Sequence, residues 1–186
     1  MFAPTSIFGG LWGVPYIMNV YGVEKPLAAS LVSLLFVGWV IGGPLSGLIV
    51  GNMSKKRPLM LAGSIGALIT MCTIIYFSSL PLPLLAILIF GFGLFSSCFL
   101  PSFSIIKELH GENNSGAALG FMNTANMMGG AIGLPLVGWM LNYCWDGTKL
   151  NNIKIYSTAD YIFSLSILPM MILISLGLVF LIKEKE

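Results

Sequence analysis

The chain has 186 residues, of which 56% are hydrophobic and only 9% are charged, and its mean hydropathy is +0.92. A typical soluble domain carries about 25% charged residues, so this composition excludes a soluble domain of any size. The net charge of +2 comes without a basic stripe, which argues against nucleic acid as a partner and leaves the lipid bilayer as the expected surroundings.

Six apolar segments follow one another along the chain, separated by short polar stretches. A helix needs about 20 apolar residues to cross the hydrocarbon core of a bilayer. The sequence therefore predicts an all-α integral membrane protein, folded as a single bundle of six transmembrane helices over residues 1–186. The predicted spans are 1–20, 27–51, 59–80, 84–106, 116–143 and 160–182.

The loops between these spans predict the orientation. Lys and Arg collect in short cytoplasmic loops. If the loop after the second span is cytoplasmic, six cations lie inside and three outside, and both termini of the bundle are cytoplasmic. The inner cations would be Lys55, Lys56, Arg57, Lys107, Lys183 and Lys185, and the outer ones Lys25, Lys149 and Lys154.

Glycines recur at four-residue spacing in the second and fifth spans. Lipid provides no hydrophobic drive between helices, so small residues that let backbones approach closely hold such helices together. Packing alone explains this pattern, and smooth faces that let helices slide in a transport cycle are the alternative. The stripes are Gly38/Gly42, Gly43/Gly47/Gly51, Gly116/Gly120 and Gly129/Gly133.

Charged residues within a span would be the first functional candidates, but none lies well inside any predicted span. The polar candidates for substrate binding are therefore Trp12, Tyr16 and Asn19 in the first span and Asn123 and Asn126 in the fifth. Asn123 and Asn126 share a helical face, where they would either form an interhelical hydrogen bond or contact substrate. Trp12 and Tyr16 would either line a cavity or lie at the membrane interface.

The sequence offers no chemistry for an enzyme. It contains neither HExxH nor GxSxG, and no pair of acids lies within a span. The three cysteines have no CxxC spacing, which argues against a metal site. We expect no cofactor, no metal and no catalytic residues.

The loop motif Gly47-Leu48-Ile49-Val50-Gly51-Asn52-Met53-Ser54-Lys55-Lys56-Arg57 resembles the GxxxDRxGR[RK] loop of major facilitator superfamily transporters. The match is partial, since Gly51 stands at the acidic position. The run from Phe99 to Glu108 and the glycine-rich run from Gly116 to Trp139 resemble the fourth and fifth helices of the C-terminal half in bacterial members.

This resemblance implies one half of a twelve-helix permease that moves a small solute by alternating access. It further implies amino acids, peptides or organic anions as substrates, a bacterial inner membrane, and a missing N-terminal six-helix half as partner. Lys107 and Glu108 would form a charge pair at the inner mouth, and Gly47, Gly51, Lys55, Lys56 and Arg57 the cytoplasmic loop motif. The alternative is a truncated membrane fragment that transports nothing, or a half-unit that needs another six-helix bundle.

Overall fold

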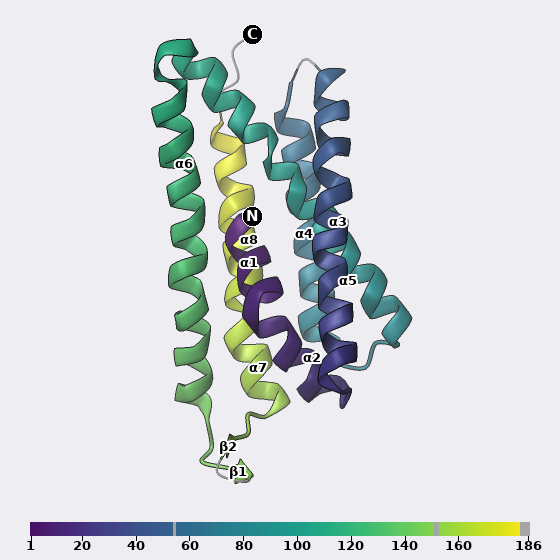
Figure 1. Ribbon diagram of the computed structural model, residues 1–186. Helices are drawn as coiled ribbons and strands as arrows, with labels where there is room; N and C mark the ends of the chain where they lie inside the picture. Colours follow the sequence, from purple (N-terminus) through teal and green to yellow (C-terminus); the bar gives the residue numbers. More distant parts are fainter. Residues whose placement is uncertain (54, 151–152, 183–186) are drawn as a thin grey trace.

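The structure, a computed structural model, describes residues 1–53, 55–150 and 153–182. Its long helices lie side by side along one axis, with a small hairpin at one end of the bundle (Figure 1). The elements are α1 (Phe2–Ile7), the π-helical turn η1 (Phe8–Trp12), α2 (Gly13–Tyr21), α3 (Lys25–Gly51), α4 (Arg57–Tyr76), α5 (Leu82–Ser96), the 3₁₀ turn η2 (Ser97–Phe99), α6 (Pro101–Cys144), β1 (Lys149–Leu150), β2 (Ile153–Lys154), α7 (Thr158–Leu165) and α8 (Ile167–Leu181).

The structure confirms the helical and apolar character predicted from the sequence. Four helical segments in the described part of the chain are long and apolar enough to cross a membrane. They are Lys25–Gly51, Arg57–Tyr76, Leu82–Leu109 and Thr158–Leu181. The predicted spans 1–20 and 116–143 are helical as well but are not among these four, so a count of six crossings stays a prediction.

Prolines divide two of the predicted spans. In the span 84–106, Pro101 has no N–H to donate to the Ser97 carbonyl, and the Leu100 N–H donates to that carbonyl instead, at 3.0 Å. The short turn η2 results. In the last span, Pro169 likewise leaves the Leu165 carbonyl without its helical donor, and α7 ends there, with only Ser166 between it and the start of α8 at Ile167.

The polar segment 107–115, predicted to be a loop, is helical, and this boundary prediction was wrong. Helix α6 runs through the segment and turns back on itself at one end of the bundle, so that its two arms lie antiparallel (Figure 1). The segment contains no proline and begins with the strong helix formers Lys107, Glu108 and Leu109, so the helix continues past the predicted end of the span at residue 106. The weaker helix formers Gly111, Asn113 and Asn114 follow within the same segment.

Glycine brings α3 and α5 into close backbone contact. A Cβ atom on Gly38 would overlap the carbonyl oxygen of Phe90, and one on Gly93 would overlap the carbonyl oxygen of Leu35. Each helix thus places a glycine where the backbone of the other approaches. The predicted packing role of the Gly38/Gly42 stripe is confirmed, since a Cβ on Gly42 would also meet α5, at 2.8 Å from the Leu94 oxygen.

Of the other three glycine stripes, one packs against a neighbouring helix, whereas most glycines of the other two have no neighbouring atoms nearby. Gly129 and Gly133 face α1, where Cβ atoms would press on the side chains of Ala3 and Ile7. Around Gly47, Gly51, Gly116 and Gly120 nothing lies within 4 Å of an added Cβ. Helix packing therefore accounts for the Gly129/Gly133 stripe and leaves the Gly47/Gly51 and Gly116/Gly120 positions without a packing role.

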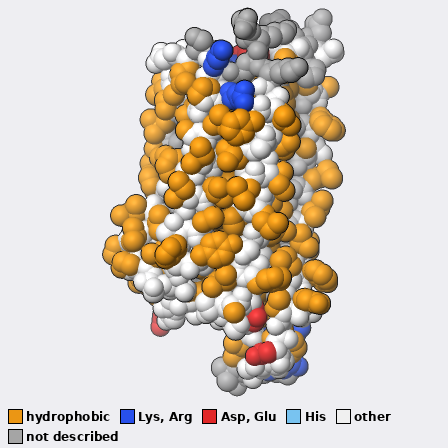
Figure 2. All heavy atoms as spheres, turned by 180° about the vertical axis from the view of Figure 1, so that it is seen from behind, with side chains coloured by type: hydrophobic (Ala, Val, Ile, Leu, Met, Phe, Trp, Pro, Cys, Tyr) orange, Lys and Arg blue, Asp and Glu red, His pale blue; other side chains and the backbone are white. Residues whose placement is uncertain are grey.

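The surface is banded in the way that a bilayer requires. Figure 2 shows hydrophobic side chains covering the middle of the visible face, with charged side chains gathered at its two ends. In the described part of the chain, exposed large hydrophobics occur on α3, α4, α6 and α8, among them Val40, Ile69, Ile132 and Ile174. In a bilayer, such side chains meet acyl chains rather than water.

Candidate functional site

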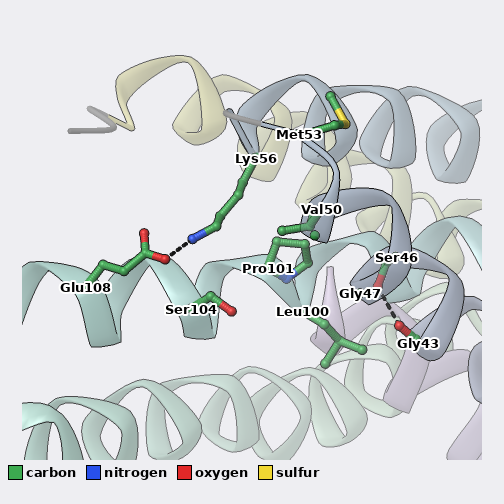
Figure 3. A pocket seen from close by; sticks show the side chains of 11 residues that line it. Gly43, Ser46, Gly47, Val50, Met53, Lys56, Leu100, Pro101, Ser104 and Glu108 are labelled. Carbon is green, nitrogen blue, oxygen red and sulfur yellow. Dashed lines mark hydrogen bonds and ion pairs between the residues drawn. The ribbon is translucent and has the colours of Figure 1, made fainter. Parts of the chain in front are cut away.

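A partly polar pocket of about 570 Å³ lies between the second half of α3 and the first turns of α6 (Figure 3). It lies at the end of the bundle that carries the loop between α3 and α4. Eleven residues line it: Gly43, Ser46, Gly47, Val50, Gly51, Met53, Lys56, Leu100, Pro101, Ser104 and Glu108.

The wall on α3 is built from the open glycine stripe. Gly43, Gly47 and Gly51 recur every four residues, so they lie on one face of the helix, and that face lines the pocket. The Ser46 hydroxyl donates to the Gly43 carbonyl at 2.8 Å, so it is already satisfied within the helix. Because the glycines carry no side chains, the wall stays hollow where ordinary residues would fill it.

The opposite wall is the start of α6. Pro101, Ser104 and Glu108 follow at spacings of three and four residues and therefore share a face, which is the face toward the pocket (Figure 3). Pro101 also ends the preceding helix, as described above, and so fixes the angle at which this arm of α6 leaves η2. The proline thus shapes the pocket through the backbone as well as by its ring.

An ion pair spans the mouth of the pocket. The Lys56 ammonium donates to Glu108 Oε1 (Figure 3), joining the α3–α4 loop to α6. The Lys56 side chain is 14% exposed and that of Glu108 is 64% exposed. The predicted charge pair contained Glu108 but assigned it the wrong cation, because side chains at adjacent helical positions such as Lys107 and Glu108 do not face each other.

The residues of the predicted loop motif lie in three different environments. Gly47, Gly51 and Lys56 belong to the pocket. The Arg57 guanidinium lies 5.4 Å from the centre of the Phe180 ring on α8, a cation–π contact that ties the loop to the last helix. Lys55 is exposed. Ser54, Lys183 and Lys185 lie outside the described residues.

The substrate candidates of the first span lie away from this pocket. Trp12 donates its indole N–H to the Leu134 carbonyl on α6 at 3.0 Å. Asn19 donates to the Tyr156 carbonyl at 2.8 Å, which joins α2 to the segment before α7. Both side chains therefore bridge the first helix to distant parts of the chain in this conformation.

Tyr16 is fully buried, and its hydroxyl lies 2.7 Å from the Ile74 carbonyl oxygen and 3.1 Å from that of Ile75. These carbonyls belong to the last turn of α4, where a helix has no intrahelical donors left. The Tyr16 hydroxyl thus completes the end of α4 from across the bundle.

We expect Tyr16→Phe to destabilise the bundle by about 1–3 kcal/mol, because it leaves buried carbonyls without this donor. Thermal unfolding of the purified protein in detergent measures the change. Tyr21→Phe is the matched control: its hydroxyl lies 3.5 Å from the Phe77 carbonyl on a part-exposed side chain, so its loss should cost less. Equal stability of Tyr16→Phe and the wild type would contradict the role assigned to this hydroxyl.

The two asparagines of the fifth span lie on the second arm of α6, also away from the pocket. Asn123 is exposed, whereas the Asn126 side-chain nitrogen is buried and has no hydrogen-bond partner among the described residues. The structure therefore does not bring these amides together with Trp12, Tyr16 or the loop motif in one site. His110 lies in the helical turn of α6, but its side chain lies outside the described residues.

The sequence reasoning missed Ser46, Pro101 and Ser104 as pocket residues. A signal was present: the Gly43/Gly47/Gly51 stripe and the Pro101–Ser104–Glu108 spacing each mark one helical face. What the sequence did not show is that these two faces lie opposite each other, because that depends on the angle at which α6 starts.

An apolar helical bundle with a charge-free middle and a polar pocket at one end defines a multi-pass membrane protein. The whole chain, residues 1–186, matches the family model of the Major Facilitator Superfamily. The chain therefore belongs to the Major Facilitator Superfamily, a family of membrane transporters, as the sequence motifs predicted. No curated protein matches the chain.

Proposed function

We propose that the chain forms the C-terminal six-helix half of a permease that moves a small solute by alternating access. The observation that carries the proposal is the pocket between α3 and α6, closed across its mouth by Lys56 and Glu108. A glycine wall without side chains opposite a polar wall, with an ion pair at the mouth that can open and close, is suited to solute passage. Amino acids, small peptides and organic anions are the substrate classes we propose.

A second six-helix bundle is part of this proposal. Transporters of this architecture hold substrate between two bundles near the midplane of the membrane, and one bundle supplies only one wall of such a cavity. We propose an N-terminal six-helix bundle as the other wall. The unpartnered amide of Asn126, together with Asn123, is our candidate for a polar contact to substrate or to that bundle.

We also propose a bacterial inner membrane as the location, with the pocket end and both termini in the cytoplasm. Cysteines introduced at Lys55 and Lys149 should react with membrane-impermeant thiol reagents from opposite sides, Lys55 from the cytoplasm. The native Cys72, Cys98 and Cys144 are replaced first. Labelling of the Lys149 position from the cytoplasmic side alone would overturn the orientation.

Transport itself is tested with purified protein in vesicles. Radiolabelled amino acids, dipeptides and organic anions are offered to vesicles that contain the chain alone or together with an N-terminal half from a related permease. Because one bundle provides one wall, we expect saturable uptake only with both halves. Robust uptake by the chain alone would mean that two copies form the cavity, and the half-transporter proposal would then be wrong.

The same vesicles test whether the pocket is on the transport route. Ser104→Cys places a thiol in the pocket, and we expect its alkylation to block uptake and the transported substrate to slow that alkylation. Ser30→Cys, exposed near the start of α3 and outside the pocket lining, is the control and should be insensitive. Full uptake after complete alkylation at position 104 would remove the pocket from the route.

A further inference from the structure

Two lysines converge on one aromatic ring at the hairpin end of the bundle. Lys149 and Lys154 are direct register partners across β1 and β2. Their ammonium nitrogens lie 5.6 Å and 4.5 Å from the centre of the Trp145 ring. Like charges directly opposite each other across two strands are destabilising, so this arrangement calls for a compensating negative charge.

The protein supplies only part of that charge. Lys154 donates to Asn142 Oδ1 in the last turn of α6, and the C-terminus of a helix carries a partial negative charge of about half a unit. This accounts for the position of Lys154. Against two full positive charges this partial charge leaves most of the positive charge uncompensated. Among the described residues, the contact given for the Lys149 ammonium is the face of Trp145.

The acidic residues of the same segment are engaged elsewhere. Asp146 Oδ1 accepts from the Thr148 backbone N–H at 2.9 Å, a hydrogen bond that lowers the pKa of Asp146 and keeps it ionised. Asp160 Oδ2 accepts from the Ser157 N–H at 2.8 Å in the cap of α7. In the described part of the chain, no carboxylate oxygen forms an ion pair with Lys149 or Lys154.

The neighbouring aromatics indicate the level of this cluster in a bilayer. Trp139 and Tyr143 stack with ring centres 5.8 Å apart and are 63% and 77% exposed. Exposed Trp and Tyr on membrane helices settle at the level of the lipid headgroups. Trp145 follows directly, so the two lysines lie where lipid phosphates are found, and lysines at this level attract anionic lipids.

We propose that Lys149, Lys154 and Trp145 form a binding site for a phosphate group, held between the two ammonium groups at the hairpin end. Two sources offer this chemistry: the phosphodiester of an anionic phospholipid and free inorganic phosphate. The site is separate from the α3–α6 pocket and does not depend on the transport proposal. Both ammonium groups lie near the Trp145 ring and come from directly paired residues, so that one anion meets both charges.

Native mass spectrometry of the delipidated full chain tests the proposal. The protein is titrated with phosphatidylglycerol or phosphatidylcholine, and the bound fraction is measured. We expect preferential binding of phosphatidylglycerol, reduced about fivefold by Lys149→Gln or Lys154→Gln and about twentyfold by both changes together. Replacing both lysines with arginine should retain binding, because the charges remain.

Lys25→Gln is the matched control, since Lys25 is an exposed lysine at the start of α3, at the same end of the bundle (Figure 1). Its affinity for phosphatidylglycerol should equal that of the wild type. Millimolar inorganic phosphate is then added to the lipid-bound protein, and a parallel sample receives chloride at the same ionic strength. Release by phosphate alone identifies free phosphate as the ligand, and retention identifies the lipid.

Two outcomes would overturn the site. One is equal phosphatidylglycerol binding by the wild type and the double glutamine variant, with no lysine-dependent effect of phosphate. The other is an equal loss of phosphatidylglycerol binding in Lys25→Gln, which would mean that binding depends on the net charge of the protein and not on this site.

Discussion

Gly93→Ala is expected to destabilise the bundle by about 1–3 kcal/mol, the usual cost of forcing an extra carbon into a filled contact. The new methyl group would overlap the Leu35 carbonyl oxygen. A backbone atom in the middle of a helix cannot rotate aside, so α3 and α5 must separate. Thermal unfolding in detergent and the yield of folded protein both measure this loss.

Gly47→Ala is the matched control because it makes the same chemical change at an open position. Nothing lies within 4 Å of the added methyl group, and alanine favours a helix by about 1 kcal/mol over glycine. We therefore expect this variant to be as stable as the wild type or slightly more stable. If both variants lost stability equally, the destabilisation would reflect glycine replacement in general and not the α3–α5 contact.

The contrast between these two glycines also shows how much of the helix packing could be predicted from the sequence. The four-residue spacing placed Gly47 in a predicted stripe but did not single out Gly93, and the apolar runs predicted the helices themselves. Spacing alone does not tell which stripe meets another helix. Gly38 meets α5 and Gly47 lines a pocket because the helices cross at one place and diverge at another, and that is a property of the three-dimensional packing.

The ion pair between Lys56 and Glu108 could not be predicted from the sequence for the same reason. Glu108 was a candidate from the sequence, and so was Lys56, but as parts of different motifs 52 positions apart. Their meeting depends on the start of α6 at Pro101 and on the loop after α3. The helical course of 107–115 was missed for a different reason: polar residues were taken as a sign of a loop, whereas Lys, Glu and Leu also favour helix.

The pair makes a strong prediction for transport. Glu108→Lys would place two ammonium groups together at the mouth of the pocket, replacing attraction with repulsion. Exposed pairs contribute about 0.2–1 kcal/mol. Reversal of one charge should therefore raise the free energy of the closed state by about 0.4–2 kcal/mol, which is about twofold to thirtyfold in population. We expect uptake to fall about tenfold, and alkylation of a thiol at position 104 to become faster.

A double variant with the two charges exchanged tests whether the effect comes from the ion pair or from either residue alone. Lys56→Glu combined with Glu108→Lys restores an opposite-charge pair in reversed order, and we expect it to recover most of the uptake and the slow alkylation. Lys107→Gln, one position before Glu108, is the control and should behave as the wild type. Failure of the swap to recover either measurement, with normal protein abundance, would mean that Lys56 and Glu108 act independently and that the pair does not hold the mouth closed.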